Sequence, residues 1–356
     1  MAAVPVSVIT GFLGSGKTTL LASLLRDPAL ARTAVIVNEF GEVGLDHLLV
    51  EASDEEIVLL DSGCVCCSVR GDLVRTAGSL LARRAAGAIA PFDRIVIETT
   101  GLADPAPILH ALMTDPGIAD SLYLESVIAT VDAAAGVATL DAHPESVKQA
   151  AIADRIVVTK TDLGDPAANG LAERLHALNP AAPKLTAVHG AIDASRLFGG
   201  GMYDAQGSDV RRWLAAEAVP HDPVDHGHDH AAGRHDGAVT SFCLRRSTPL
   251  RAVTLTLFLQ VLAEHCGARL LRLKGLVDVL ESPGRPAVIH GVQHVFHPPV
   301  WLDAWPDEDR TTRIVVIALG LDPLWLKALL DALDVEVAAL QMRATTDAGV
   351  LSTRKE

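Results

Sequence analysis

The sequence has few basic residues, no long apolar run and few cysteines. Its 30 Lys and Arg residues are outnumbered by 44 Asp and Glu residues, and the net charge of −14 argues against a sequence-independent nucleic-acid binder. No stretch reaches the roughly 18 uncharged apolar residues that a membrane span needs. No signal peptide is visible either, because the apolar strand expected from about Val4 leaves no room before it for a cleavable segment. We therefore expect a cytoplasmic protein with no nucleic-acid or membrane partner.

The five cysteines are odd in number and clustered, which favours metal or redox chemistry over a disulfide framework. A chain of 356 residues with 49% hydrophobic content is long enough for two domains, each with a core. Over residues 197–237 glycine, proline and histidine accumulate and apolar periodicity fades. We expect a nucleotide-binding domain over 1–196, a flexible histidine-rich linker over 197–237 and a second domain over 238–356.

The strongest motif spans residues 11–18, which read GFLGSGKT and match the phosphate-binding loop G-x-x-x-x-G-K-[ST]. An apolar strand precedes it and a helical stretch follows it, as this motif requires. Glycines let backbone N–H groups surround phosphates, and the helix N-terminus adds partial positive charge. We expect Lys17 to supply a full charge and Thr18 to hold Mg²⁺. The predicted nucleotide contacts are Gly11, Gly14, Ser15, Gly16, Lys17, Thr18 and Thr19.

Apolar runs recur along the first 160 residues with helical stretches between them. The runs are apolar throughout, which is typical of a parallel sheet flanked by helices. Strands are expected at 4–10, 34–38, 56–60, 94–98, 126–131 and 155–159, and helices at 19–25, 71–86, 105–113, 144–153 and 168–178. The second domain is expected to have strands at 238–244, 269–274, 277–280, 287–290 and 313–319, and helices at 249–266 and 323–333. The predicted fold is a P-loop NTPase α/β domain with a mostly parallel sheet, followed by a smaller α+β domain.

Residues 98–101, which read ETTG, follow an apolar strand as a Walker-B carboxylate does. We expect Glu98 to act in catalysis and to reach Mg²⁺ through water, and the backbone N–H of Gly101 to face the γ-phosphate. Polar residues also end other strands, among them Asp132. Ligand sites of such sheets lie at these strand ends.

Residues 159–162, which read TKTD, resemble the guanine-reading N/T-K-x-D motif. A buried Asp162 would accept two hydrogen bonds from guanine and would be left unpaired by adenine, so we expect GTP. Thr159 replaces the more usual Asn, which removes one side-chain contact to the base. The predicted guanine-binding residues are Thr159, Lys160 and Asp162.

Three thiols fall within four residues at Cys64, Cys66 and Cys67. Thiolates bind borderline divalent metals, and three of them leave a fourth position for an exchangeable ligand, which suits delivery. Reversible disulfide chemistry is the second interpretation of this motif. Three buried cysteines acting as small hydrophobes are the third. Cys243 and Cys266, in contrast, are expected to be buried core thiols.

Residues 38–42, which read NEFGE, lie where P-loop GTPases keep their first switch, and Asp46 follows. These acids could contact Mg²⁺, orient water, complete the metal site or form a solvated loop. We assign Glu39 and Glu42 to a Zn²⁺ or Co²⁺ site with the thiols, and Asp46 to catalysis. Histidines later alternate with acids in a tract that is interpreted either as a weak metal-collecting site or as a polar spacer. Its candidate ligands are His226, His228 and His230.

Together these motifs resemble the CobW-type GTPases, a metallochaperone branch related to the urease and hydrogenase nickel-insertion GTPases. The nucleotide-binding half contributes GFLGSGKTT at 11–19, NEFGE at 38–42, GCVCC at 63–67, ETTG at 98–101 and TKTD at 159–162. The second domain contributes RLKG at 272–275, HGVQ at 290–293 and RIVVI at 313–317. The segments at 39–44 and 101–105 look closer to the zinc-associated YjiA-like members than to the cobalamin-pathway protein.

The resemblance implies GTP hydrolysis coupled to binding Zn²⁺ or Co²⁺ through the three thiols and to handing it to a metal-requiring client protein. It also implies that the histidine tract helps to gather metal. Hydrolysis is expected to be slow, since no arginine finger can be identified. The main alternative is a non-catalytic zinc buffer or sensor with a regulatory nucleotide site. A small-molecule kinase and a thiol redox switch are further alternatives, and a homodimer stays open.

Overall fold

The computed structural model describes residues 3–37, 57–59, 68–167, 169–198 and 239–352. The chain divides into two compact units, Met1–Pro220 and His221–Glu356. The predicted linker at 197–237 falls almost entirely outside the described residues. Each unit is described by itself below.

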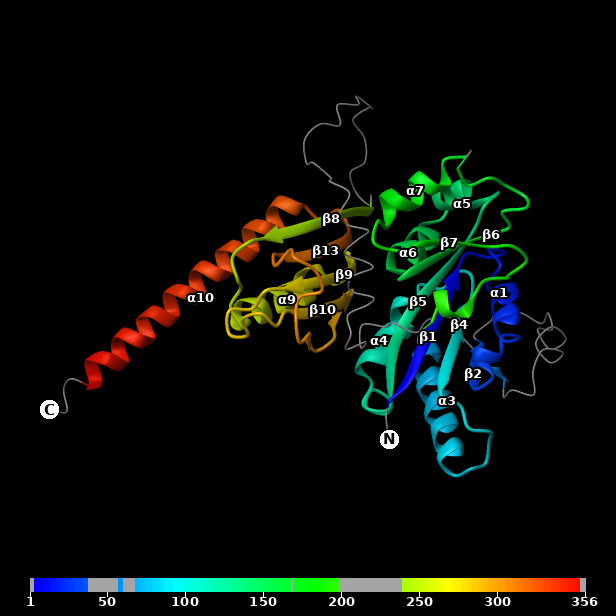
Figure 1. Ribbon diagram of the computed structural model, residues 1–356, viewed down its shortest axis with the longest axis horizontal. Helices are drawn as coiled ribbons and strands as arrows, with labels where there is room; N and C mark the ends of the chain where they lie inside the picture. Colours follow the sequence, from blue (N-terminus) through cyan, green and yellow to red (C-terminus); the bar gives the residue numbers. More distant parts are fainter. Residues whose placement is uncertain (1–2, 38–56, 60–67, 168, 199–238, 353–356) are drawn as a thin grey trace. The chain divides into compact units, whose positions relative to one another are not determined.

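The first unit is built on a seven-stranded sheet with the order β3-β2-β4-β1-β5-β6-β7, and every neighbouring pair is parallel (Figure 1). Residues 6–11 of the central strand are all buried, so both faces of the sheet are covered. The strands are β1 (Val4–Gly11), β2 (Thr33–Val37), β3 (Ile57–Leu59), β4 (Arg94–Glu98), β5 (Leu122–Asp132), β6 (Arg155–Thr159) and β7 (Lys184–Ala187).

The helices of the first unit connect these strands. They are α1 (Lys17–Leu24), α3 (Ser68–Ala85), α4 (Ala106–Thr114), α5 (Gly136–Ala142), α6 (Pro144–Ile152) and α7 (Leu171–Leu178). Leu20, Leu21 and Leu24 of α1 pack into a buried cluster with strand residues such as Ile9 and Ile128. This packing holds the start of α1 against the carboxyl end of β1.

The carboxyl ends of the central strands lie at one edge of the sheet. Ile9 is the register partner of Glu98, and Gly11 is the partner of Thr130. Asp132 is in turn the partner of Thr159. The register therefore brings three of the sequence motifs to the same edge, where ligand sites of parallel sheets lie.

The second unit contains an antiparallel sheet with the order β11-β10-β9-β13-β8, and β12 pairs with β10. Its strands are β8 (Val239–Arg246), β9 (Leu270–Val277), β10 (Ala287–Val292), β11 (Val295–Phe296), β12 (Val300–Trp301) and β13 (Thr312–Leu319). Helices α9 (Ala252–Cys266) and α10 (Pro323–Ser352) pack on the sheet through residues such as Phe258 and Leu326. The α/β class with a smaller α+β domain is thus confirmed.

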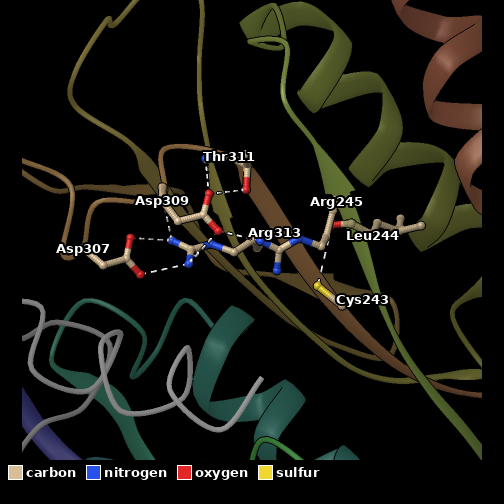
Figure 2. A network of polar contacts seen from close by, with 7 residues as sticks. All are labelled: Cys243, Leu244, Arg245, Asp307, Asp309, Thr311 and Arg313. Atoms are coloured by element: carbon tan, nitrogen blue, oxygen red, sulfur yellow. Dashed lines mark hydrogen bonds and ion pairs between the residues drawn. The ribbon is translucent and has the colours of Figure 1, made fainter. Parts of the chain in front are cut away.

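Polar contacts join β8 to the loop before β13 in this unit. Figure 2 shows the Arg313 guanidinium meeting Asp307, with two nitrogen–oxygen distances of 2.9 Å. Arg245 contacts Asp309 at 2.5 Å. Burial opposes ionisation of Asp309, but hydrogen bonds from Thr311 and the nearby arginines outweigh it and lower the pKa of that carboxyl.

Several sequence expectations are wrong in detail. The predicted strands at 269–274 and 277–280 are one strand, β9, followed by a turn. The helix predicted at 323–333 runs on to Ser352, and α5 and β7 were not expected. Cys266 is buried as predicted, whereas Cys243 is exposed because it alternates with the core residue Leu244 on β8.

Candidate nucleotide-binding site

The loop between β1 and α1 has a backbone that requires glycine. Gly11, Gly14 and Gly16 have φ angles of 142°, 71° and 92°, which L side chains rarely adopt. A Cβ atom on Gly11 would lie 2.4 Å from the Thr130 hydroxyl oxygen and 2.5 Å from the Thr130 carbonyl oxygen. The loop is therefore pressed against the end of β5, and only glycine fits at its first position.

Lys17 lies at the first position of α1, with 8% of its surface exposed. Its Nζ donates hydrogen bonds to the carbonyl oxygens of Gly11 at 3.0 Å and Phe12 at 3.1 Å. The ammonium group is thus held inside the loop, next to the N-terminus of a helix. A fixed positive charge in this position, together with loop N–H groups, suits a phosphate.

Thr18 and Glu98 meet across the strand ends. The Thr18 hydroxyl donates to Glu98 Oε1 at 2.7 Å, and only 2% of Glu98 is exposed. A hydroxyl and a carboxylate are hard oxygen ligands of the kind that Mg²⁺ takes beside nucleotide phosphates. These two side chains therefore fit the Mg²⁺ ligands of a P-loop site in chemistry and in proximity.

Thr159 ties the TKTD segment to the phosphate loop. Its hydroxyl, on a residue that is 4% exposed, donates to the Ser15 carbonyl oxygen at 2.7 Å. The Ser15 hydroxyl in turn is 2.6 Å from that of Thr130. Thr159 thus supports the phosphate loop, a contact that was not predicted from the sequence, where Thr159 was considered only as a replacement for a base-contacting Asn.

Lys160 follows with a positive φ of 55°, and its Nζ lies 2.7 Å from Asp132 Oδ2. Burial opposes ionisation of Asp132, but the hydrogen bonds from Lys160 and from the N–H groups of Ala135 and Ala134 outweigh it and lower the pKa of that carboxyl. This ion pair joins β5 to β6. Asp162, in contrast, is exposed on the turn after β6, so the buried carboxylate assumed in the guanine argument is not present.

Gly101 lies directly against the phosphate loop. A Cβ atom on it would be 2.6 Å from the backbone nitrogen of Leu13 and 2.7 Å from the Leu13 Cα. The preceding Thr99 extends the sheet, because its N–H donates to the Ile9 carbonyl at 2.9 Å. The ETTG segment and the phosphate loop are therefore in contact, as a nucleotide site requires.

Two residues of this site carried no usable sequence signal. Thr130 supports the loop through Ser15, and Gln149 on α6 contacts Gly101. Both are more than 100 residues from the loop in sequence, and neither belongs to a known short motif. Only the fold brings them to the site.

The remaining predicted site residues lie outside the described part of the chain. They are Asp46, Glu39, Glu42, Cys64, Cys66, Cys67, His226, His228 and His230. Of the described neighbours, Val37 is the register partner of both Glu98 and Leu59. Val37, the last described residue before one of these segments, therefore lies beside Glu98, and Leu59, the last before another, lies one strand further from it. Within the ranges that the structure describes, no three His, Cys, Asp or Glu side chains are grouped to hold a metal.

Among the helices that the structure describes, none combines the length and the apolar character that a membrane span requires.

Comparison with protein families matches residues 5–186 to the CobW/HypB/UreG nucleotide-binding domain and residues 239–334 to the cobalamin synthesis protein cobW C-terminal domain.

The chain is similar over most of its length to characterised relatives. It is 33% identical to the zinc chaperone YjiA of Escherichia coli K12, over 89% of this chain and 95% of the relative. It is 32% identical to the zinc chaperone CobW of Pseudomonas aeruginosa, over 90% of this chain and 89% of the relative. The crystal structure of Zn(II)-bound YjiA GTPase from E. coli superposes with a TM-score of 0.69 at 28% identity, covering 94% of this chain and 99% of that one.

Proposed function

Because the chain belongs to the CobW/HypB/UreG family of P-loop GTPases, we propose that it is a zinc metallochaperone whose GTP cycle gates metal binding and delivery to a client protein. The observation that carries the nucleotide half of this proposal is the contact of Thr18 with the buried Glu98 beside Lys17. The zinc half is supported by the relatives, which are named zinc chaperones.

In this proposal the phosphate loop binds GTP through Gly11, Gly14, Ser15, Gly16 and Thr19. Lys17 exchanges its carbonyl partners for phosphate oxygens, and Thr18 and Glu98 hold Mg²⁺. That ion, when bound, neutralises charge on the phosphates of the nucleotide. Gly101 donates its N–H to the γ-phosphate, and Asp46 acts in the hydrolysis step. Thr159, Lys160 and Asp162 form the guanine side, and Asp162 lies on the exposed turn after β6.

We assign zinc to Cys64, Cys66 and Cys67, with Glu39 and Glu42 as further ligands. The register supports coupling, because Val37, which precedes one of these segments, pairs with Glu98, and Leu59, which precedes the other, pairs with Val37. GTP then orders the metal ligands and hydrolysis relaxes them, as γ-phosphate contacts do in switch GTPases. Metal binding is therefore tighter with GTP than with GDP, and metal tightens GTP binding by linkage.

His226, His228 and His230 form a weaker collecting site in this scheme, and the carrier passes its metal to a client. The same ligands also bind Co²⁺, which makes cobalt a useful spectroscopic probe.

The decisive experiment titrates Zn²⁺ and Co²⁺ into the protein with Mg·GTP, with Mg·GDP and without nucleotide, for wild type, Cys66→Ala and Cys243→Ala. The Cys243→Ala variant is the matched control, because it removes an exposed thiol of the second unit. We expect a thiolate charge-transfer band with cobalt, tight binding only with GTP, and loss of both in Cys66→Ala alone.

Other outcomes separate the alternatives. Binding that ignores the nucleotide, with no measurable GTP hydrolysis, would make the protein a zinc buffer or sensor. Binding that survives Cys66→Ala would move the metal to the histidine tract.

A further inference from the structure

Gln149 holds the turn that follows the ETTG segment. It lies on α6 with 1% of its surface exposed, and its Nε2 donates to the carbonyl oxygens of Gly101 at 3.1 Å and Ala103 at 3.0 Å. Both hydrogens of one side-chain amide are thus used on a single three-residue turn. A buried amide placed in this way fixes the turn rather than merely filling space.

The direction of these hydrogen bonds requires an amide. If the amide were reversed, its oxygen would face two carbonyl oxygens, which are also acceptors. Glutamate would add a negative charge against the same two oxygens, and methionine would leave both carbonyls, one of them on the buried Gly101, without this donor. The arrangement therefore depends on glutamine as a hydrogen-bond donor.

The same helix also contacts the phosphate loop. Gln149 lines a cavity of about 40 Å³ together with Phe12, Leu13 and Ser15. The ring of His143, which precedes α6, stacks on Phe12 with 4.3 Å between ring centroids. The turn held by Gln149 is itself pressed against Leu13. Helix α6 and the residue before it thus adjoin both the phosphate loop and the turn after Gly101.

A neighbouring ion pair holds the other end of the turn. Lys148 Nζ lies 3.3 Å from Asp104 Oδ2, while Asp104 Oδ1 accepts a hydrogen bond from the N–H of Ala106 at the start of α4. Consecutive residues of α6 therefore hold the segment from Gly101 to Asp104. A displacement of Gly101 would therefore disturb contacts with both α4 and α6.

We infer that Gln149 is a positioning residue for GTP binding and hydrolysis, which keeps the Gly101–Ala103 turn in the conformation that receives the γ-phosphate. The inference rests on the GTPase site and does not depend on the metal. Only GTP has a γ-phosphate to meet this turn, whereas GDP contacts the phosphate loop and the guanine side but not the turn. Preorganising the turn therefore increases the affinity for GTP relative to GDP. It also stabilises the charge that develops on the transferred phosphoryl group.

The test compares Gln149→Met, which retains size and removes the donor, with Asn179→Leu as a matched control. Asn179 is also 1% exposed, and its Nδ2 donates to the carbonyl oxygens of Ala150, Ala151 and Ala153 at the far end of α6. Affinities for a non-hydrolysable GTP analogue and for GDP are measured for each variant, with kcat/KM for hydrolysis and the thermal midpoint.

We expect Gln149→Met to weaken binding of the GTP analogue about tenfold relative to GDP and to lower kcat/KM at least as much. Asn179→Leu should lower the thermal midpoint and leave the ratio of the two affinities unchanged. Equal weakening of GTP and GDP binding by Gln149→Met would show a merely structural role and overturn the inference.

A measurement on the wild-type protein covers the case in which Gln149→Met does not fold. Amide hydrogen exchange of the α6 peptide is compared with the GTP analogue and with GDP bound. We expect slower exchange with the GTP analogue, and identical exchange in the two states would also overturn the inference. If zinc and cobalt affinity proved independent of the nucleotide, the expected effects of Gln149→Met on GTP and GDP binding would be unchanged. The two proposals can therefore fail independently.

Discussion

Two glycines of the phosphate loop share a positive φ and differ in their surroundings. A Cβ atom at Gly14 would meet nothing within 4 Å, whereas one at Gly11 would meet the backbone and side chain of Thr130. We expect Gly14→Ala to cost about 1–2 kcal/mol from backbone strain alone. Gly11→Ala should add about 1–3 kcal/mol of steric overlap and abolish nucleotide binding.

Urea unfolding and binding of a fluorescent GDP analogue measure both effects for the two variants. Equal losses at the two positions would mean that the contact with Thr130 does not shape the loop.

At the scale of the element, one carboxylate anchors α10. Asp334 is 9% exposed and accepts from Arg246 at 2.6 Å, Arg251 at 3.1 Å and Thr254 at 3.0 Å. Asp334→Ala leaves two arginines without this partner, and we expect a loss of about 3 kcal/mol. Asp331 lies on the same helix as Asp334, its side chain is 51% exposed, and it also pairs with Arg246 of β8. Asp331→Ala is the matched control and should cost less than about 1 kcal/mol.

Tryptophan fluorescence follows the unfolding of the second unit for this comparison, because Trp301, Trp305 and Trp325 lie in it. Similar losses for the two aspartate variants would contradict the assigned role of Asp334.

The elements that the sequence predicted are those with a strong local signal. The sequence predicts two strands at 269–274 and 277–280, and Gly275 lies in the gap between them. The structure gives a packing reason for that glycine, since a Cβ atom there would lie 2.8 Å from Ile289 Cγ1 and 3.0 Å from Ile314 Cγ1. Gly275 makes room for side chains of both adjacent strands and does not end its own.

Short elements were missed because tertiary packing, and not propensity, stabilises them. Helix α5 has only seven residues and begins at a glycine, a poor helix former. Strand β7 has four residues at the sheet edge, one of them exposed, so it lacks the continuous apolar run of the central strands. The motif residues Lys17, Thr18 and Glu98 were predictable from spacing. Gln149 was not, because its hydrogen bonds span more than 40 residues of chain.

At the scale of the whole molecule, the two units have separate cores, which predicts separate responses to ligand. Mg·GDP at 100 times its Kd should stabilise the first unit by about 2.7 kcal/mol. Hydrogen exchange of β1 and α1 should slow accordingly. Tryptophan fluorescence of the second unit, in a Trp213→Phe background, should show an unchanged unfolding midpoint. An equal shift in both signals would mean that the units unfold together.

The position of β1 in the sheet has a consequence during synthesis. It lies in the centre of the sheet between β4 and β5, yet it is made before both of them, because they begin only at Arg94 and Leu122. At translation rates of about 5–20 residues per second, β1 waits roughly 6 to 22 seconds before both neighbours have begun. For that time an apolar segment is open to chaperones and to aggregation. The phosphate loop that follows it can assemble only when β5 has emerged.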